Sequence, residues 1–566
     1  MQYPDVPNPD LLARIPLVAR TVLDVGCGSG ALGAEYKRRN PAARVFGIER
    51  DADAARLAAS RLDHVFVADL DQDCAALQEE LADGSIDCLV YGDVLEHFRD
   101  PWGVLKSHLR LLSAHGVVLI CMPNAEHWTF VERLLRGTWD YEDQGLFDAT
   151  HLRWFTPSTV RHELERAGLV IVDVIPRIFE IAACETFVDA VEPALNRLGI
   201  DRNTYQERAA PIQHVWRATR RPAVAPLHLV STMLNPVGGV SHLRVVEPMR
   251  ALDADVSITT DTISNSDLPP DSAGERRIFI FHRPLLAGEQ GLARVRNLIE
   301  RGWLVVCEFD DHPDYIPVLQ RPDIQNFRAV HAVQTSTEPL ANVLRQYNPE
   351  VMVFPNAVAR LPDVRNYANP DCVTLFFAGL NRENEWPPYL DALNTVAARS
   401  GSRLHFQIVN DRGLFEALQT PHKTYTPLCD YDTYQSLLGT SEISFMPLLD
   451  TPFNRCKSDL KFIEAAAHRV ATLASTIVYG GSVEDGRTGV LFHDAQELER
   501  KLSRLVANPE TGLGIGNAAR SYVANNRMLA YQIAGRSAWY HSLWARREQL
   551  NQTLLARVPE LAPPTR

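Results

Sequence analysis

The sequence contains no long basic tract, no uninterrupted apolar run of the length that crosses a membrane, and no C-x-x-C pair. Its formal net charge of −13 argues against nucleic acid as the main partner, because nucleic-acid-binding surfaces are basic. A transmembrane helix needs about 20 consecutive apolar residues, so we expect no membrane-spanning segment. The basic residues within 217–221 leave open a peripheral association with the inner membrane through anionic lipid.

The nine cysteines are scattered and show no metal-binding spacing, so we expect buried, reduced thiols rather than a disulfide framework. The first ten residues, MQYPDVPNPD, lack the basic and apolar regions of a secretory signal peptide. The sequence also lacks short repeats and low-complexity segments. We therefore expect a folded, cytoplasmic protein.

Short apolar segments alternate with amphipathic segments through most of the 566 residues, which predicts parallel α/β layers. At about 150 residues per domain, this length allows three or four compact units. The segment RRPAVAP at 220–226 combines charge, proline and small residues, and is the best linker candidate. We therefore predict three domains, which cover residues 1–222, 226–358 and 359–566.

The apolar segments predict a first sheet whose strands lie at 21–25, 44–48, 64–67, 86–91, 116–122, 169–174 and 213–218. A long aromatic-rich loop is expected at 123–156, and a helical insert at 178–208. Two further sheets are expected, with strands at 227–231, 256–260, 277–281, 303–308, 329–335 and 351–354, and then at 372–378, 404–409, 442–445, 470–474 and 489–492.

The strongest motif is VLDVGCGSG at 22–30, in which Gly26, Gly28 and Gly30 lie between a buried strand and a helix. Glycines permit the tight turn and let a ligand approach the backbone. The spacing G-x-G-x-G, with Asp24 before it, differs from the G-x-G-x-x-G of dinucleotide sites. It favours S-adenosylmethionine, which brings no pyrophosphate to the helix N-terminus. NAD is the alternative ligand.

Acidic residues follow the next predicted strands. Glu49 ends the second strand, where a carboxylate can bind both ribose hydroxyls of the cofactor. Asp69 follows the third strand and is placed to accept a hydrogen bond from the adenine amino group. Asp93, within GDVLEHFRDP at 92–101, completes the set of expected cofactor-binding residues.

Three segments make residues 20–220 resemble the class I methyltransferases related to ubiquinone-biosynthesis O-methyltransferases: GDVLEHFRDP, Pro123–Asn124 and GLFDATHLRWFT at 145–156. This resemblance implies a Rossmann-like fold and S-adenosylmethionine as cofactor, and it leaves the methyl acceptor open.

Methyl transfer requires alignment of the acceptor with the methyl group, and a hydroxyl acceptor also needs a base. Either His97 or His151 is the candidate for that base. No metal-ligand pattern is visible in the sequence, so we predict metal-independent chemistry. The aromatic residues of the loop either form a wall of the acceptor site or pack as the core of the loop: Trp139, Tyr141, Trp154 and Phe155.

Residues 226–545 carry five motifs in order: NPVGGVSHLR at 235–244, QTSTEPLANVLRQY at 334–347 with FPNAV at 354–358, FFAGLNRENEW at 376–386, NRCKSDLKFIEAAAHRVATLAS at 454–475, and EDGRTGVLF at 484–492. This series resembles GT-B glycosyltransferases of the family 4 and family 1 type. The resemblance implies two Rossmann-like halves, with a nucleotide sugar bound by the second half. Gly238 and Gly239 are expected to begin a helix whose free amides attract phosphate or a sugar hydroxyl.

The resemblance also implies that basic side chains neutralise the diphosphate of the donor, which carries the leaving charge. We assign Arg382 and either Lys457 or Lys461 to this role. Glu464 matches the second acid of the E-x7-E pattern, which holds the ribose. The first acid is missing, because Cys456 stands in its place. A surface ion pair between Lys461 and Glu464, three residues apart on a helix, is the alternative interpretation.

Three residues are expected at the carboxyl edge of the second sheet, where ligands bind in open α/β folds. His282 ends its third strand, and Asp310 and Asp311 follow the fourth. Each is a candidate to orient a sugar acceptor.

The sequence thus favours a bifunctional enzyme of bacterial surface-glycan biosynthesis, which methylates a sugar or related hydroxyl and transfers a sugar from a nucleotide donor. The partners would be the donor and a glycan or sugar-bearing acceptor. One alternative is an active methyltransferase fused to a non-catalytic glycan-binding module. Another is a small-molecule methyltransferase of quinone type with a fused scaffold.

Overall fold

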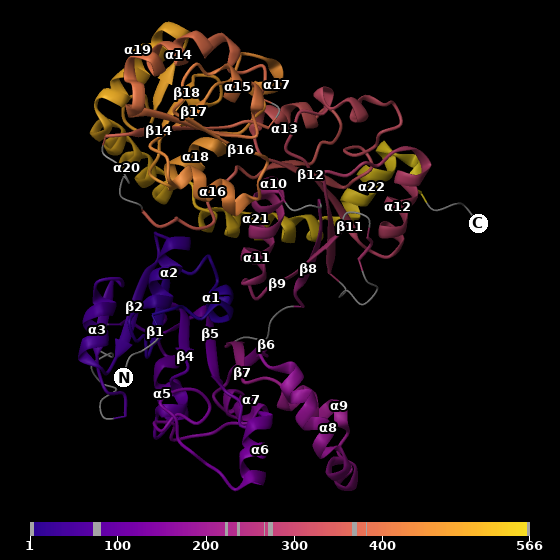
Figure 1. The fold of residues 1–566 in the computed structure, drawn as a ribbon. Helices are drawn as coiled ribbons and strands as arrows, with labels where there is room; N and C mark the ends of the chain where they lie inside the picture. Colours follow the sequence, from indigo (N-terminus) through magenta and orange to yellow (C-terminus); the bar gives the residue numbers. More distant parts are fainter. Residues whose placement is uncertain are drawn as a thin grey trace. The chain divides into compact units, whose positions relative to one another are not determined.

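The computed structural model describes residues 5–562, apart from 72–80, 221–224, 235–237, 265–266, 270–275, 365–370 and 381. The chain forms two compact units. The first comprises Met1–Val224 with Asp253–Ser257, and the second comprises Ala225–Leu252 with Ile258–Arg566. Both are built from alternating strands and helices (Figure 1), which confirms the predicted α/β class. In the part of the chain that the structure describes, no helix combines the length and apolar character needed to cross a membrane.

The amino-terminal unit has one seven-stranded sheet in the order β3-β2-β1-β4-β5-β7-β6. Its strands are β1 (Thr21–Val25), β2 (Arg44–Glu49), β3 (His64–Val67), β4 (Ile86–Gly92), β5 (Leu112–Pro123), β6 (Val170–Arg177) and β7 (Gln213–Thr219). Only β7 runs antiparallel to its neighbours among these strands. The carboxyl ends of β1 to β4 therefore share one edge, and the order reverses between β1 and β4, where α/β sheets bind ligands.

The helices of this unit are α1 (Pro9–Arg14), α2 (Ala31–Arg39), α3 (Ala52–Ala59), α5 (Pro101–Leu109), α6 (Trp128–Arg136), α7 (Pro157–Arg166), α8 (Ile181–Leu198) and α9 (Arg202–Ala209). The last two form the predicted helical insert. Helix α6 was not predicted, because the sequence analysis assigned 123–156 entirely to a loop. It forms because WTFVERLLR has one apolar face, from which Phe130 is buried against Leu146 and Phe147.

The carboxyl-terminal unit has two parallel six-stranded sheets, in the orders β13-β12-β11-β10-β8-β9 and β16-β15-β14-β17-β18-β19. The first half contains β8 (Leu227–Met233), β9 (Ile258–Ser264), β10 (Arg277–His282), β11 (Leu304–Glu308), β12 (Ala332–Thr335) and β13 (Val351–Val353). The second contains β14 (Val373–Ala378), β15 (Leu404–Val409), β16 (Lys423–Thr426), β17 (Ile443–Met446), β18 (Ala471–Ser475) and β19 (Val490–Phe492). The second half has the doubly wound order of a Rossmann sheet, with its switch point between β14 and β17. Strand β16 was not predicted.

The helices of the first half are α10 (Gly239–Ser241), α11 (Glu247–Asp253), α12 (Gly288–Glu300) and α13 (Glu338–Leu344). Those that follow are α14 (Leu390–Ser400), α15 (Arg412–Ala417), α16 (Tyr431–Gly439), α17 (Pro452–Arg455), α18 (Leu460–Ala467), α19 (Ala495–Ala507), α20 (Pro509–Asn526), α21 (Ala530–Ala545) and α22 (Arg547–Arg557). Helix α22 returns to the first half, because Leu554 and Val558 belong to the same apolar core as Phe279 and Val305. Figure 1 shows α22 beside α12.

Candidate functional site

The glycine motif forms the turn from β1 into α2. Gly26, Gly28 and Gly30 have φ angles of 73°, 53° and 76°, a region that side chains with a Cβ rarely adopt. A Cβ at Gly26 would lie 2.4 Å from Cγ2 of Val94. The turn therefore requires small residues, as the sequence predicted.

Glu49 is held against this turn at the end of β2. The Gly28 amide donates a hydrogen bond of 2.9 Å to one carboxylate oxygen of Glu49, and the Asp51 amide donates one of 2.8 Å to the other. The neighbouring Asp24 is also buried, and burial, with a contribution from the charge of Glu49, raises its pKa to about 7.

A cavity of about 780 Å³ opens at the carboxyl edge of this sheet. Four of the predicted cofactor residues line it: Gly26, Glu49, Asp69 and Asp93. Asp24, Gly28 and Gly30 are not among the lining residues of the described chain. Gly28 acts on the site through its hydrogen bond to Glu49. The opposite wall comes from the loop segment 142–151.

Asp93 has a strained backbone, with φ of 52°. The Gln213 side-chain amide donates a hydrogen bond of 2.5 Å to its carboxylate. Burial raises the pKa of Asp93 to about 6.

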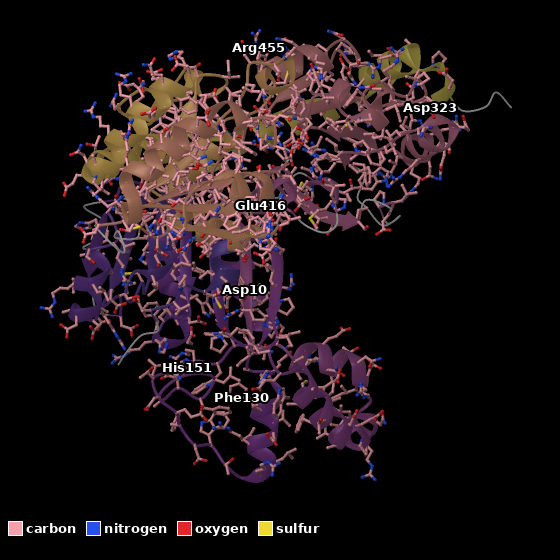
Figure 2. All side chains as sticks on the ribbon, turned by 45° about the horizontal axis from the view of Figure 1, so that its top comes forward. Asp10, Phe130, His151, Asp323, Glu416 and Arg455 are labelled. Carbon is pink, nitrogen blue, oxygen red and sulfur yellow. The ribbon has the colours of Figure 1, made fainter. Side chains whose placement is uncertain are left out.

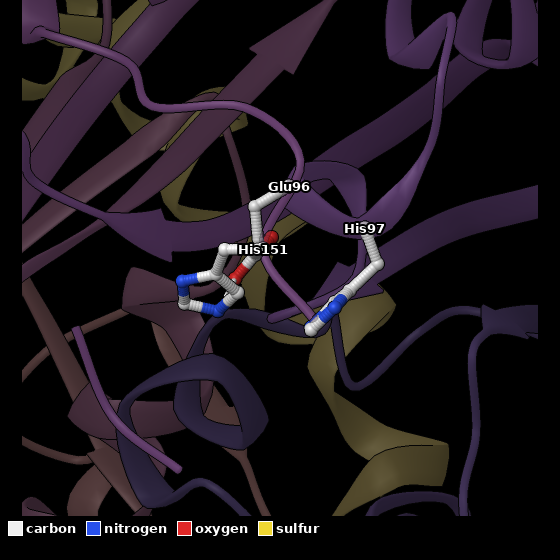
Figure 3. A group of neighbouring side chains, drawn as sticks. All are labelled: Glu96, His97 and His151. Atoms are coloured by element: carbon white, nitrogen blue, oxygen red, sulfur yellow. Dashed lines mark ion pairs between the residues drawn. The ribbon is translucent and has the colours of Figure 1, made fainter. Parts of the chain in front are cut away.

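Glu96, His97 and His151 all line the cavity, and Figure 3 shows their side chains as one group. The His97 and His151 rings lie 4.8 Å apart, and His151 Nε2 lies 3.9 Å from Glu96 Oε1. Both carboxylate oxygens of Glu96 and Nδ1 of His151 are buried without a hydrogen-bond partner among the described residues. Burial, with the charge of Asp93, holds the pKa of Glu96 well above its usual value.

The neighbours of His97 decide which of its ring nitrogens carries the proton. Thr150 donates a hydrogen bond of 2.6 Å from its hydroxyl to Asp148, so the same hydroxyl must accept the 3.0 Å bond from His97 Nδ1. The Thr150 carbonyl lies 3.2 Å from the same nitrogen. Burial also lowers the pKa of His97. His97 is therefore neutral, with a lone pair on Nε2 that can accept a proton.

The aromatic residues of the loop pack mostly on each other. Trp139 contacts Phe130, Phe147 and Trp154, and Phe155 packs on Trp102. In Figure 2, Phe130 and His151 both lie in the lower part of this unit. None of Trp139, Tyr141, Trp154 and Phe155 is among the described residues that line the cavity, which argues against the acceptor wall. The loop-core interpretation suits Trp139, Trp154 and Phe155, whereas Tyr141 is exposed.

In the carboxyl-terminal unit, three basic side chains meet at the switch point of the second half. Lys461 donates a hydrogen bond of 2.8 Å to the carbonyl of Ala378, the last residue of β14. Burial and the nearby charge of Arg382 lower the pKa values of Lys457 and Lys461, each to about 8. The carboxylates of Asp310 and Asp311, from the first half, also act on Lys457.

Glu464 is buried, and its carboxylate is already occupied by three donors. The hydroxyl of Tyr431 lies at 2.8 Å, that of Tyr434 at 3.0 Å and the amide of Gln435 at 2.9 Å. No ion pair joins Glu464 to Lys461 among the described residues, and burial raises the pKa of Glu464 although the charge of Lys461 acts against this rise. The surface ion pair was therefore the wrong alternative.

Tyr431 also packs beside Gly239, in the motif NPVGGVSHLR at 235–244. Its ring carbon Cδ2 lies 2.9 Å from where a Cβ at Gly239 would stand, and its ring stacks on His242. Gly239 is the first residue of α10, with Gly238 as its N-cap, and the helix continues through a π-helical segment, His242–Val246, into α11. The first three residues of the motif NPVGGVSHLR, 235–237, lie outside the described residues.

At the edge of the first half, His282 is fully buried, and neither ring nitrogen has a partner among the described residues. Burial lowers its pKa to about 4. Asp310 and Asp311 both form ion pairs with Arg283, at 2.6 and 2.8 Å. In the second half, sequence reasoning missed Glu385, which is buried and accepts hydrogen bonds from the Asn454 side chain and from the Leu449 amide.

A family model described as a methyltransferase domain matches residues 6–174. The ubiquinone biosynthesis O-methyltransferase of Pseudomonas paraeruginosa is 31% identical over 167 residues, which cover 29% of this chain and 69% of that protein. The chain belongs to this methyltransferase family. An uncharacterised 37.1 kDa protein of a Streptomyces fradiae transposon is 31% identical over 196 residues, 33% of this chain and 52% of that protein. The chain thus spans about half to two thirds of the length of these relatives.

A solved structure is similar over a larger share of the chain. A mutant of S. aureus TarM, in complex with fondaparinux, alpha-GlcNAc-glycerol and UDP, matches 48% of this chain and 56% of that chain, at a TM-score of 0.36 and 13% identity.

The amino-terminal unit is thus an S-adenosylmethionine-dependent methyltransferase domain. The side-chain atoms of Glu96, His97 and His151 lie within 4.8 Å of one another, so this methyltransferase could hold a metal ion with two imidazoles and a carboxylate. Metal-independent chemistry therefore stays a prediction. Sequence reasoning missed Glu96 as a site residue, although it directly precedes the predicted His97.

Proposed function

We propose that the methyltransferase domain transfers a methyl group from S-adenosylmethionine to a hydroxyl of its acceptor. The observation that carries this proposal is the neutral His97, whose Nε2 lone pair is left by the Nδ1 tautomer and which lies beside the buried Glu96 in the cavity that Glu49 and Asp69 also line. A hydroxyl at this end of the cavity would have a proton acceptor within reach while the cofactor lies across the carboxyl ends of β2 and β3.

The reaction is a displacement at the sulfonium methyl group. The acceptor oxygen forms a bond to the methyl carbon as the carbon–sulfur bond breaks, and its proton moves to Nε2 of His97. Adenosylhomocysteine then leaves. Glu49 would accept hydrogen bonds from the ribose hydroxyls with the lone pairs that the Gly28 and Asp51 amides leave unused. Asp69 would accept a hydrogen bond from the adenine amino group.

For the carboxyl-terminal unit we propose glycosyl transfer from a nucleotide sugar. Arg382, Lys457 and Lys461 gather at the switch point of a doubly wound sheet, where they would bind the diphosphate of the donor and stabilise the leaving group. The facing His282, Asp310 and Asp311 would orient the acceptor. The enzyme would then be bifunctional and act on a sugar-bearing acceptor of a bacterial surface glycan, in the cytoplasm or at the inner membrane.

Two observations favour a second candidate, a non-catalytic glycan-binding module. Cys456 replaces the first acid of the E-x7-E pattern. The carboxylate of Glu464, which would otherwise hold the ribose, already accepts hydrogen bonds from Tyr431, Tyr434 and Gln435. The third candidate, a quinone-type methyltransferase with a fused scaffold, is favoured by the names of the relatives.

The test is to incubate the full chain with labelled S-adenosylmethionine and two acceptor panels, one of sugars and glycans and one of quinols and phenols. Labelled nucleotide sugars are supplied in a parallel series. We expect methylation of a sugar hydroxyl together with hydrolysis or transfer of one nucleotide sugar. Methylation of phenols alone would support the quinone-type candidate, and sugar methylation without turnover of any nucleotide sugar would support the binding module.

A further inference from the structure

A second cavity, of about 380 Å³, lies in the carboxyl-terminal unit, away from the residues proposed for glycosyl transfer. Its size is within the range of small-ligand sites. Its lining comes from the amino ends of β10 and β11, from the end of α12 and from the helices α21 and α22: Arg276, Arg277, Ile299, Gly302, Trp303, Leu304, Trp544, Arg547 and Asn551. His282, at the other end of β10, is five residues from Arg277, or about 17 Å along the strand.

Arg276, Arg277 and Arg547 line this cavity, and none of its described lining residues is acidic. Arg276 donates hydrogen bonds to the Ala225 carbonyl and to a ring nitrogen of His541, neither of which carries a negative charge at neutral pH. Arg547 has only the exposed Glu548, at 3.7 Å, as a described ion-pair partner. Arg277 lies over the ring of Trp303, and Arg547 over that of Trp544. Arg276 and Arg547 thus have no buried acidic partner among the described residues.

The neutral groups of the lining are donors as well. His331 accepts a hydrogen bond from the Val305 amide on Nδ1, so its Nε2 carries the proton and donates to Asn551 Oδ1 at 2.6 Å. Burial lowers the pKa of His331 to about 4, which keeps this tautomer neutral. The Asn551 side chain is thereby oriented, and its NH₂ group remains available as a donor. The indole N–H of the buried Trp303 has no acceptor among the described residues.

We propose that this cavity binds a diphosphate group. A diphosphate offers only acceptor oxygens and several negative charges, which match the guanidinium groups of Arg276 and Arg547 and two neutral N–H donors. One guanidinium group can donate two parallel hydrogen bonds to phosphate oxygens, which adds directional specificity to the attraction between the charges. The diphosphate belongs either to a soluble nucleotide or to a lipid-linked molecule, because both present the same group.

The test uses the full chain labelled with 5-fluorotryptophan, in which the variants Trp303→Phe and Trp544→Phe assign two of the nine tryptophan signals. Inorganic pyrophosphate is the probe. We expect saturable shifts of both signals, and Arg276→Gln and Arg547→Gln should each weaken binding by at least about tenfold, the usual loss for a hydrogen bond to a charged group. The matched control is Arg500→Gln, which removes an exposed arginine of α19 and should bind like the wild type.

Three results would overturn the proposal. They are the absence of a saturable shift below about 1 mM, equal affinity in Arg276→Gln, Arg547→Gln and wild type, and equal shifts with sodium chloride at the same ionic strength. Titrations with UDP and with vesicles that contain a prenyl diphosphate then separate the two sources. Stronger binding of UDP assigns a soluble ligand, and stronger binding of the vesicles assigns a lipid-linked one.

Discussion

At the scale of single residues, the methyltransferase cavity contains polar groups that lack the partners that burial usually requires. Glu96 and Nδ1 of His151 are unpaired among the described residues, whereas His97 is oriented by Thr150 and Asp148. An acceptor hydroxyl would meet all three side chains at once. The unpaired groups therefore mark the reacting end of the cavity, and three predictions belong to this scale.

We expect His97→Gln to lower the rate of methyl transfer by a factor of about 100 or more, because the acceptor hydroxyl loses its base. The affinity for adenosylhomocysteine should stay at the wild-type value, since Glu49 and Asp69 are untouched. Single-turnover kinetics and calorimetry measure the two quantities. His162→Gln, at an exposed position of α7, is the control. If His97→Gln keeps the wild-type rate while His151→Gln loses it, His151 is the base.

Asp24 should make the stability of β1 depend on pH. Burial raises its pKa to about 7, whereas an aspartate in an unfolded chain titrates near 3.9. The folded state thus holds the proton more tightly, and this stabilisation is complete below about pH 4 and is lost as the pH rises towards 7. Hydrogen exchange measures the free energy of opening of the β1 amides. In the wild type this free energy should change with pH by as much as about 4 kcal/mol, and Asp24→Asn should remove that change.

The control for this measurement is Asp53→Asn, because Asp53 is an exposed acid on α3. It should keep the wild-type dependence of exchange on pH. A wild-type protein whose β1 stability does not change between pH 4 and 8 would contradict the raised pKa of Asp24.

Removal of metal should leave methyl transfer unchanged, because His97 supplies a base without one. The rate is measured after dialysis against a chelator and again after addition of Zn²⁺ or Mg²⁺. A loss of activity that either ion restores would show that Glu96, His97 and His151 hold a metal, and the prediction of metal-independent chemistry would be wrong.

At the scale of elements, the cofactor site depends on the turn between β1 and α2 and on the carboxyl edge that parallel strands share. The turn places the Gly28 amide where it orients Glu49, which comes from the neighbouring β2. A change in the turn therefore alters a carboxylate on another strand.

We expect Gly28→Val to abolish methylation. A β-branched side chain at φ of 53° is strained, and the Gly28 amide can no longer hold Glu49 in place. Binding of adenosylhomocysteine, measured by calorimetry, should fall in parallel. Gly137→Val imposes the same kind of strain at φ of 72°, in open space at the end of α6, and should bind the cofactor product normally. If Gly28→Val binds adenosylhomocysteine with wild-type affinity, the turn is not part of the cofactor site.

At the scale of the whole molecule, the chain joins two compact units that each carry their own candidate site. The second unit is completed by α22, because its Leu554 and the following Val558 pack into the core of the first half. The two proposed reactions should accordingly be separable by substitutions in one unit at a time.

We expect Lys461→Met to abolish binding of the nucleotide sugar while methyl transfer keeps its wild-type rate. Because the pKa values of Lys457 and Lys461 lie at about 8, the lysines lose their charge at lower pH than usual, and donor affinity should fall as the pH rises from 7 to 9. Calorimetry at several pH values measures this. Constant affinity across this range would mean that neither lysine binds the diphosphate.

Glu464→Ala separates the two proposals for the second unit. It should weaken donor binding if Glu464 exchanges its bonds to Tyr431 and Tyr434 for bonds to a ribose. Unchanged affinity would assign Glu464 to the support of those tyrosines.

The local pattern of the sequence determined the α/β class, most strand positions and the glycine turn at 26–30, because alternation, strand-to-helix turns and positive φ angles are written in short segments. It also placed Glu49, Asp69 and Asp93 at one edge, since the carboxyl ends of parallel strands meet. Helix α6 was not predicted, because aromatic residues such as those in this segment also occur in loops.

Only the tertiary structure decided what depends on residues far apart in the chain. The proton position on His97 follows from Thr150 and Asp148, about fifty residues away. The occupation of Glu464 by Tyr431 and Tyr434, and the donor-lined cavity that α22 closes against β10, likewise arise from packing between distant elements. Burial and hydrogen-bond partners are properties of the folded neighbourhood, and no short segment contains them.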